Sequence, residues 1–160
     1  MPPRSTEQAQ HRDTPRASFE LFPPRSERAA QRVGETVAAL STLGPRFLSV
    51  TCGAGGSAAG RTCDTVRRLR AATRAPIAAH LTCVSGSRAE VDAQARAYRD
   101  LGVRHLVALR GDPPRGESVF RPRRDGYDCS ASLVAGLRAI ADFDISVAGY
   151  PETHPDAAST

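Results

Sequence analysis

A cation, a glycine and a carboxylate follow an apolar stretch near the middle of the chain. Residues 105–109 have the composition of a buried strand, and Arg110, Gly111 and Asp112 come directly after it. Two prolines then prevent the strand from continuing. Because ligands in α/β folds bind beyond the carboxyl ends of the strands, these three residues are candidates for a binding site. The alternative is a surface ion pair between Arg110 and Asp112.

Two further apolar stretches each contain one titratable residue. Glu20 lies between Phe19 and Leu21, where burial would remove water from the carboxylate, raise its pKa and suit it to donate a proton. Strand alternation equally allows Glu20 to face solvent. His80, within the apolar residues 77–82, is either a site residue or a hydrogen-bonded histidine of the core.

A glycine-rich segment, residues 53–57, precedes a predicted helix and has the composition of a phosphate-binding loop. It does not fit the dinucleotide-binding fingerprint, because it follows the second predicted strand and Ala58 replaces the last glycine. A tight turn is the alternative interpretation of this segment.

These residues lie on a repeating pattern of strand and helix. The predicted strands cover residues 17–22, 47–51, 77–82, 105–109 and 145–148, and the predicted helices cover residues 26–43, 60–73, 87–101 and 130–141. A repeat of about thirty residues indicates successive βα units and a parallel sheet. Both an open doubly wound sheet and a closed (β/α)₈ barrel have this pattern. Polar residues at the ends of nearly all strands favour the barrel, where they converge on one mouth.

The length of 160 residues allows a single domain. A (β/α)₈ TIM barrel has eight units and about 250 residues, so we expect an incomplete barrel of about five βα units over residues 17–160. Residues 1–16 are polar and are predicted to form a disordered leader.

Composition excludes several classes of function. The net charge is +5, and all 22 basic residues are arginines, with few aromatic residues to stack on bases, so no nucleic-acid partner is expected. The four cysteines have no C-x-x-C spacing, which indicates neither a metal site nor a disulfide framework. No apolar run is long enough to span a membrane, and residues 1–16 lack the apolar core that is typical of a signal peptide. The sequence therefore predicts a cytoplasmic protein without a membrane partner.

Five segments together resemble the methylenetetrahydrofolate reductase family, in the family's order and spacing. They are SFELFPP at 18–24, SVTCGAGGS at 49–57, AHLTC at 79–83, HLVALRGDP at 105–113, and DFDISVA at 142–148 with YPETHP at 150–155. The resemblance implies a flavoprotein with a (β/α)₈ barrel. Such an enzyme uses FAD and NADH or NADPH to reduce methylenetetrahydrofolate to methyltetrahydrofolate, a reaction of one-carbon metabolism and methionine biosynthesis. It also implies a homo-oligomer for the full-length enzyme.

The resemblance assigns roles to particular residues. Glu20 matches the general acid that protonates the folate nitrogen as the imidazolidine ring opens to an iminium. Asp112 matches a carboxylate that faces both the flavin and the folate. The positions matched to contacts with FAD or the nicotinamide are Thr51, Cys52, Ala54, His80, Arg110, Gly111, Asp112, Ser130, Tyr150, His154 and Ala157. The arginine and backbone amides would offset the charge of the diphosphate.

The sequence also departs from the family. Cys52 stands where the family often has tyrosine, and residues 129–132 replace its Tyr-Ala-Ser-Asp pattern, with Tyr127 as a candidate substitute for the missing tyrosine. The family's last three strands would lie beyond Thr160. We therefore expect residues 1–160 alone to be poorly stable, to self-associate or to need a complementing piece. The alternative function is that of a non-catalytic barrel remnant or assembly module lacking the folate-binding half.

Overall fold

The computed structural model describes residues 17–52, 59–84, 86–113 and 116–152. Five strands alternate with four helices in this part of the chain: β1 (Phe19–Leu21), α1 (Glu27–Ser41), β2 (Leu48–Val50), α2 (Ala59–Ala72), β3 (Ile77–Thr82), α3 (Arg88–Asp100), β4 (His105–Leu109), α4 (Ser130–Ile140) and β5 (Asp144–Val147). Each predicted strand and helix is confirmed, and the ends differ from the predicted ends by no more than two residues. The predicted leader, residues 1–16, lies outside the described residues.

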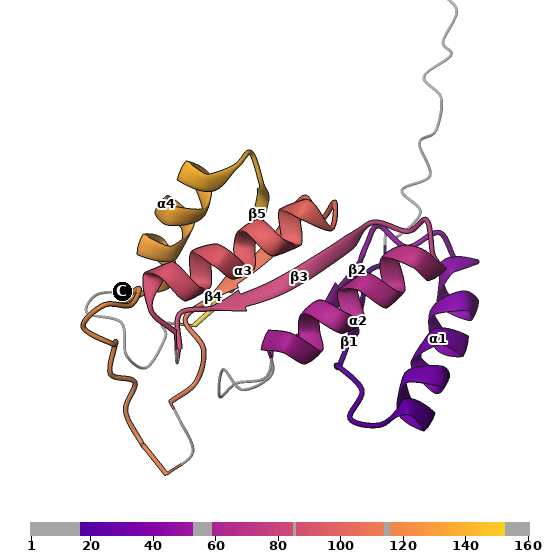
Figure 1. Cartoon of the computed structure of the whole chain (residues 1–160), viewed down its shortest axis with the longest axis horizontal. Helices are drawn as coiled ribbons and strands as arrows, with labels where there is room; N and C mark the ends of the chain where they lie inside the picture. The colour runs from indigo at the N-terminus through magenta and orange to yellow at the C-terminus, as the bar shows by residue number, and fades with distance from the viewer. Residues whose placement is uncertain (1–16, 53–58, 85, 114–115, 153–160) are drawn as a thin grey trace, which may run out of the picture.

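The strands form one parallel sheet in the order β1-β2-β3-β4-β5. Each strand pairs with the next strand in the sequence, so all crossovers run in the same direction, and right-handed crossovers then place the helices on one face. A doubly wound sheet reverses direction and has helices on both faces. The observed order is therefore that of a barrel. In Figure 1, α2 and α3 lie along β3, with α1 and α4 toward the two ends of the sheet. The fold is α/β, and the described residues contain five strands and four helices of an incomplete (β/α)₈ barrel.

Alternation along the strands separates an apolar face from a polar face. The apolar face packs against the helices and consists of Leu48, Val50, Ile77, Ala79, Leu81, Leu106 and Ala108. The opposite face includes Glu20, Ser49, His80, Thr82, His105 and Ser146. The helices complete the core with residues at helical spacing, such as the buried Val66 and Leu69 of α2. The core therefore lies between the sheet and the helices, and the polar face is left for a site.

A local signal fixes the start of α3. The hydroxyl of Ser87 accepts a hydrogen bond from the backbone N–H of Glu90 at 3.3 Å, and the Glu90 carboxylate accepts one from the backbone N–H of Ser87 at 2.8 Å. This is a capping box at the start of α3. The carboxylate also accepts a hydrogen bond from the Ser87 hydroxyl at 2.8 Å, and its bonds from the backbone N–H and the hydroxyl of Ser87 lower the pKa of Glu90.

The loop before α4 is held by one tyrosine that packs against a glycine. Tyr127 is 4% exposed, its hydroxyl donates to Asp92 Oδ1 at 2.7 Å, and the guanidinium of Arg88 lies 5.0 Å from its ring centroid. A Cβ placed on Gly136 of α4 would overlap the Tyr127 hydroxyl and lie 2.6 Å from ring atom Cζ. Because Tyr127 is buried and hydrogen-bonded, it has little room to move.

We expect Gly136→Ala to lower the free energy of unfolding by about 1–3 kcal/mol because of this overlap. A destabilising effect would be the reverse of the usual one, since alanine in a helix interior normally stabilises by about 1 kcal/mol relative to glycine. The matched control is Gly34→Ala in α1, where an added Cβ meets nothing within 4 Å and should stabilise by about 0.5–1 kcal/mol. Urea unfolding measures both, and two variants of the same sign would contradict the packing.

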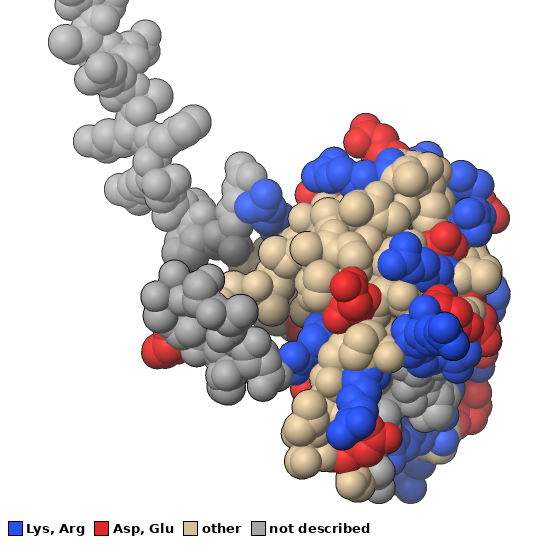
Figure 2. Space-filling model, turned by 90° about the vertical axis from the view of Figure 1, so that its left-hand side faces the viewer, with Lys and Arg blue, Asp and Glu red and all other residues tan. Residues whose placement is uncertain are grey.

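The charged surface is mixed on the side where α4 lies. Figure 2 shows basic and acidic side chains interspersed among uncharged residues over this face. No helix in the described part of the chain is long and apolar enough to cross a membrane.

Candidate functional site

Because all five strands are parallel, their carboxyl ends lie along one edge of the sheet. Most of the predicted site residues fall at this edge, at strand ends or shortly after them. Those within the described residues are Thr51 and Cys52 after β2, His80 in β3, Arg110, Gly111 and Asp112 after β4, Ser130 at the start of α4, and Tyr150 after β5.

A carboxylate and an imidazole meet on the polar face of the sheet. Glu20 Oε2 lies 3.4 Å from His80 Nε2. The register explains the pair, because Glu20 is opposite Ser49, and Ser49 is opposite Ala78, two residues before His80. The Glu20 side chain is 52% exposed and that of His80 is 10% exposed. The expectation that Glu20 is buried among apolar side chains is therefore wrong. The helices cover only the opposite face of the sheet.

The protonation of His80 follows from its surroundings. Burial lowers the pKa of His80 below its ordinary value of 6.5, with a further lowering from His105, while the Glu20 carboxylate opposes the shift. At neutral pH the imidazole is therefore uncharged. A neutral imidazole can hydrogen-bond the Glu20 carboxyl group and orient it without adding a positive charge.

Hydroxyl and thiol groups cluster where β2 ends. Thr51 is buried, and its backbone N–H donates to the carbonyl of Leu21 at 3.0 Å, while its own carbonyl accepts from the Thr62 hydroxyl at 3.0 Å. Burial raises the pKa of the Cys52 thiol, although hydrogen bonds to Thr62 and Thr82 oppose the shift. These contacts connect the ends of β2 and β3 to the first turn of α2.

The Arg-Gly-Asp segment after β4 lies against the end of β3. Gly111 has φ +86°, and a Cβ placed on it would lie 2.8 Å from Val84 Cγ1. The guanidinium of Arg110 lies 5.1 Å from the ring centroid of Phe120. Asp112 is exposed beside them. The segment thus presents a cation and a carboxylate at the carboxyl edge, on a backbone whose shape only glycine adopts readily.

The amino terminus of α4 is attached to the same edge. The thiol of Cys83, directly after β3, donates to the carbonyl of Cys129 at 3.4 Å, and Ser130 begins α4. Burial raises the pKa of Cys83 to about 11, so this thiol stays protonated at neutral pH. Tyr127 does not replace a site tyrosine here, because its ring packs in the core and its hydroxyl bonds Asp92.

Some predicted residues are not placed with this group. Ala54, His154, Ala157 and the glycine-rich residues 53–57 lie outside the described residues. Tyr150 lies after the end of β5, where its side chain is 59% exposed. The central group therefore consists of Glu20, Thr51, Cys52, His80 and the segment 110–112.

Thr82, a polar residue at the end of its predicted strand, hydrogen-bonds Cys52 and lies on the same face as His80. One residue of this edge was missed by the sequence interpretation. Phe120 supports Arg110 from the long loop after β4, where no periodic signal exists. In the described residues, no group of three or more His, Cys, Asp and Glu is arranged to hold a metal ion.

Comparison with known proteins identifies the family. The family model described as methylenetetrahydrofolate reductase matches residues 5–160. The chain is 44% identical over 142 residues to 5,10-methylenetetrahydrofolate reductase of Salmonella typhimurium, covering 89% of this chain and 46% of that protein. It is 38% identical over 142 residues to methylenetetrahydrofolate reductase (NADH) 1 of Zea mays, covering 88% of this chain and 24% of that protein.

The chain thus spans about half the length of the bacterial relatives it matches. A solved structure of 2,3-dimethylmalate lyase overlays with a TM-score of 0.49 at 11% identity, covering 82% of this chain and 46% of that one. The fold assignment itself rests on the strand order, and the family assignment rests on the sequence matches. The chain belongs to the methylenetetrahydrofolate reductase family.

Proposed function

We propose that this chain takes part in the reduction of methylenetetrahydrofolate to methyltetrahydrofolate, with FAD as cofactor and NADH or NADPH as co-substrate. The observation that carries the proposal is the meeting of Glu20 with His80, on the sheet face that also leads to the Arg-Gly-Asp segment. Glu20 can donate a proton, and the guanidinium group of the Arg-Gly-Asp segment can bind an anion. A reductase of a folate iminium needs both, together with a hydride carrier.

The donors at the carboxyl edge fit a flavin dinucleotide. Arg110 offers a guanidinium for a diphosphate, and Gly111 keeps the adjacent backbone free of a Cβ, which allows close approach. Thr51 and Ser130 add hydroxyl groups at the same edge. When bound, FAD would accept a hydride from the nicotinamide and pass it to the folate.

Glu20 is the residue that would donate the proton. In its acid form it would donate a proton to the folate nitrogen that leaves as the imidazolidine ring opens, which makes the exocyclic carbon an electrophilic iminium. Neutral His80, at 3.4 Å, would orient the carboxyl group. The Asp112 carboxylate would accept hydrogen bonds from N–H groups of the pterin ring and so hold the ring in place.

The direct test is the visible absorption spectrum of the purified chain after FAD is added and the excess removed by gel filtration. A retained and shifted flavin band that is bleached by NADH without oxygen is the expected result. Arg110→Gln should weaken FAD binding by about tenfold or more, because a charge-assisted contact is lost. Arg138→Gln, on the exposed side of α4, is the matched control and should leave FAD binding unchanged.

The alternative function, an assembly module, predicts a different result. A module keeps its fold but neither retains FAD nor reacts with NADH, and Arg110→Gln then changes nothing measurable. The presence of Glu20, His80, Arg110 and Asp112 at one edge of the sheet favours the enzyme.

A further inference from the structure

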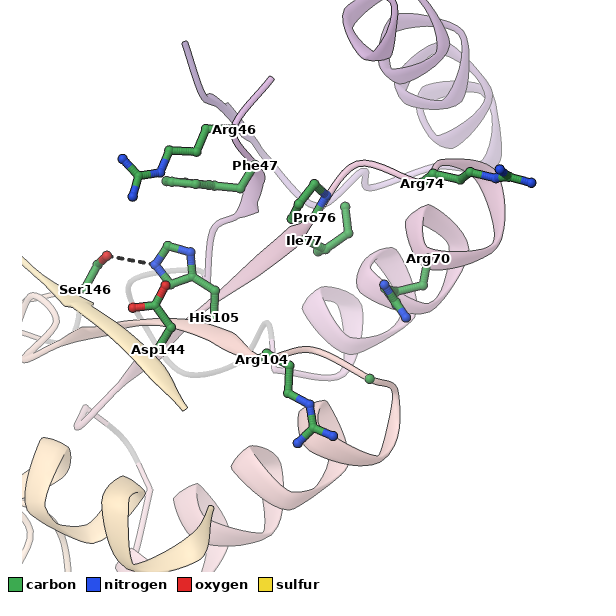
Figure 3. A pocket seen from close by; sticks show the side chains of 11 residues that line it. Arg46, Phe47, Arg70, Arg74, Pro76, Ile77, Arg104, His105, Asp144 and Ser146 are labelled. Atoms are coloured by element: carbon green, nitrogen blue, oxygen red, sulfur yellow. Dashed lines mark hydrogen bonds between the residues drawn. The ribbon is translucent and has the colours of Figure 1, made fainter. Parts of the chain in front are cut away.

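A hollow of about 610 Å³ lies at the amino ends of the strands, away from the carboxyl edge. Its lining includes Arg46, Arg74 and Arg104, and Figure 3 shows these three side chains pointing away from one another. Two other groups meet there, since the Ser146 hydroxyl lies 2.8 Å from His105 Nε2 and joins β5 to β4. The arginines of this hollow are thus spread apart, whereas reactive groups from separate elements converge at the opposite edge of the sheet.

Two cysteines that are distant in the sequence come together at the carboxyl edge. Cys83 follows β3 directly, and Cys129 is the N-cap residue of α4. The Cys83 thiol lies 3.4 Å from the carbonyl oxygen of Cys129. Burial is the largest cause of the raised pKa of Cys83, and the charge of the Cys129 thiol is the next, ahead of Asp128. Because the interaction between charges weakens with distance, this order indicates that the two sulfur atoms are close neighbours.

A turn of the Cys129 side chain about its Cα–Cβ bond would carry its sulfur toward Cys83. The backbone of Cys83 is fixed, because its N–H donates to the Leu109 carbonyl at 3.1 Å. Cys129 is exposed, and its thiol contacts the Ser132 hydroxyl at 3.8 Å and the Asp128 carboxylate. The Cα atom of Cys129 is two covalent bonds from its carbonyl oxygen, which places it within about 6 Å of the Cys83 sulfur. A disulfide joins Cα atoms that are about 4–7 Å apart, a range that this contact allows.

Each cysteine alone has an ordinary explanation. A buried cysteine such as Cys83, which is 3% exposed, normally acts as a small apolar residue. Cys129 belongs to the segment 129–132, where this chain departs from the Tyr-Ala-Ser-Asp pattern of its family. The departure places a second thiol beside the buried one, and the pair can form a bond that neither thiol could form alone.

We propose that Cys83 and Cys129 form a reversible intrachain disulfide when the protein reacts with a peroxide. Cys129 reacts first because it is exposed, whereas the buried Cys83 thiol stays protonated at neutral pH. The Cys129 sulfur bonds to one peroxide oxygen and the O–O bond breaks. The other oxygen leaves as water with the proton of the Cys129 thiol, and Cys129 becomes a sulfenic acid.

The second step consumes the sulfenic acid. The Cys83 sulfur bonds to the Cys129 sulfur, the S–O bond breaks, and the hydroxyl group leaves as water with the proton of the Cys83 thiol. Two thiols are thereby oxidised to one disulfide, and one peroxide is reduced to two water molecules. The disulfide would join the end of β3 to the start of α4 and close a loop that contains β4 and the Arg-Gly-Asp segment. This proposal does not depend on the function proposed above, because no step uses a flavin or a folate.

Counting the free thiols of the native chain before and after treatment with one equivalent of hydrogen peroxide tests the proposal. The chain has four cysteines, so we expect four free thiols before treatment, two after it, and four again after reduction with dithiothreitol. Cys129→Ser should keep its three thiols under the same treatment. Cys63→Ser, the matched control in α2, should fall from three thiols to one.

A peptide map identifies the pair. Each cysteine lies in a different tryptic peptide, and mass spectrometry after alkylation should find residues 75–88 joined to residues 125–138. The same treatment of the chain already unfolded in urea should give mixed pairs, because the native fold selects this one. A cross-link also constrains the unfolded chain, so the oxidised protein should unfold at a higher urea concentration than the reduced protein. Cys129→Ser should show no such rise.

Several results would overturn the proposal. The first is a thiol count that peroxide leaves unchanged. Others are a map in which Cys129 pairs with Cys52 or Cys63, a disulfide that joins two chains, or the same pairing in the native and the unfolded chain. Oxidation of Cys129 to sulfinic acid while Cys83 stays reduced would also contradict it, because the two sulfur atoms would then be too far apart to bond.

Discussion

Glu20→Gln is expected to lower the rate of folate reduction by about 100- to 10,000-fold while leaving flavin reduction by NADH unchanged. The amide has the shape of the carboxyl group and can still contact His80 at a similar distance. It cannot donate a proton to the leaving nitrogen. Anaerobic rapid-mixing absorption separates the two steps, since NADH bleaches the flavin band and methylenetetrahydrofolate restores it.

The matched control is Glu35→Gln on the exposed side of α1, where the carboxylate accepts from Gln31 and lies away from the sheet. This variant should leave both steps unchanged. Equal losses of both steps in Glu20→Gln would mean that Glu20 supports the cofactor site and is not the acid. Unchanged folate reduction would exclude it from the proton transfer altogether.

The elements were predictable from the sequence because each one is specified locally. Proline residues and left-handed glycines stop the strands and helices, and Ser87 with Glu90 starts α3. The apolar periodicity changes from two to 3.6 at each boundary. The choice of a barrel over a doubly wound sheet followed from where polar residues fall, and the strand order confirms it.

The surroundings of Glu20 were not predictable in the same way. Both neighbours of Glu20 in the sequence are apolar, but neighbours along a strand point to the opposite face. What surrounds a strand residue is set by the adjacent strands, and here these bring His80 of β3 beside it. The pairing of Glu20 with His80 depends on register across β2, which local sequence does not encode.

Contacts made by irregular segments were also hidden from the sequence. Phe120 lies in a loop without periodicity, yet its ring lies beside Arg110. Tyr127 could be read as a site residue because of its place in the chain, but its hydroxyl bonds Asp92 of α3. Such contacts join segments that are distant in the sequence, and composition alone does not specify them.

Gly111→Ala is expected to lower the free energy of unfolding by about 2–5 kcal/mol. Two costs add at this position. A side chain at φ +86° costs about 1–2 kcal/mol, because the left-handed region brings Cβ against the backbone. The new Cβ would also lie 2.8 Å from Val84 Cγ1 and 3.2 Å from Thr82 Cβ, and overpacking of this kind costs about 1–3 kcal/mol. Urea unfolding measures the sum.

Gly116→Ala separates the two costs. Gly116 has φ +93°, close to that of Gly111, but an added Cβ meets nothing within 4 Å. It should therefore show the backbone cost alone, of about 1–2 kcal/mol. If Gly111→Ala and Gly116→Ala are equally destabilised, the close approach of the new Cβ to Val84 does not contribute to the loss of stability.

Val84→Ala tests the contact from the other side. Val84 is 5% exposed, so its truncation alone is destabilising, but it removes the atom that the new Cβ would strike. In the double variant Gly111→Ala/Val84→Ala the loss should be about 1–3 kcal/mol smaller than the sum of the single losses. Arg110 and Asp112 flank Gly111, so the same close packing that makes alanine costly also holds the cation and the carboxylate at the edge of the sheet. Gly111→Ala alone should therefore lower both the free energy of unfolding and the affinity for FAD. If Gly111→Ala/Val84→Ala recovers stability relative to the sum of the single losses, its affinity for FAD should recover as well.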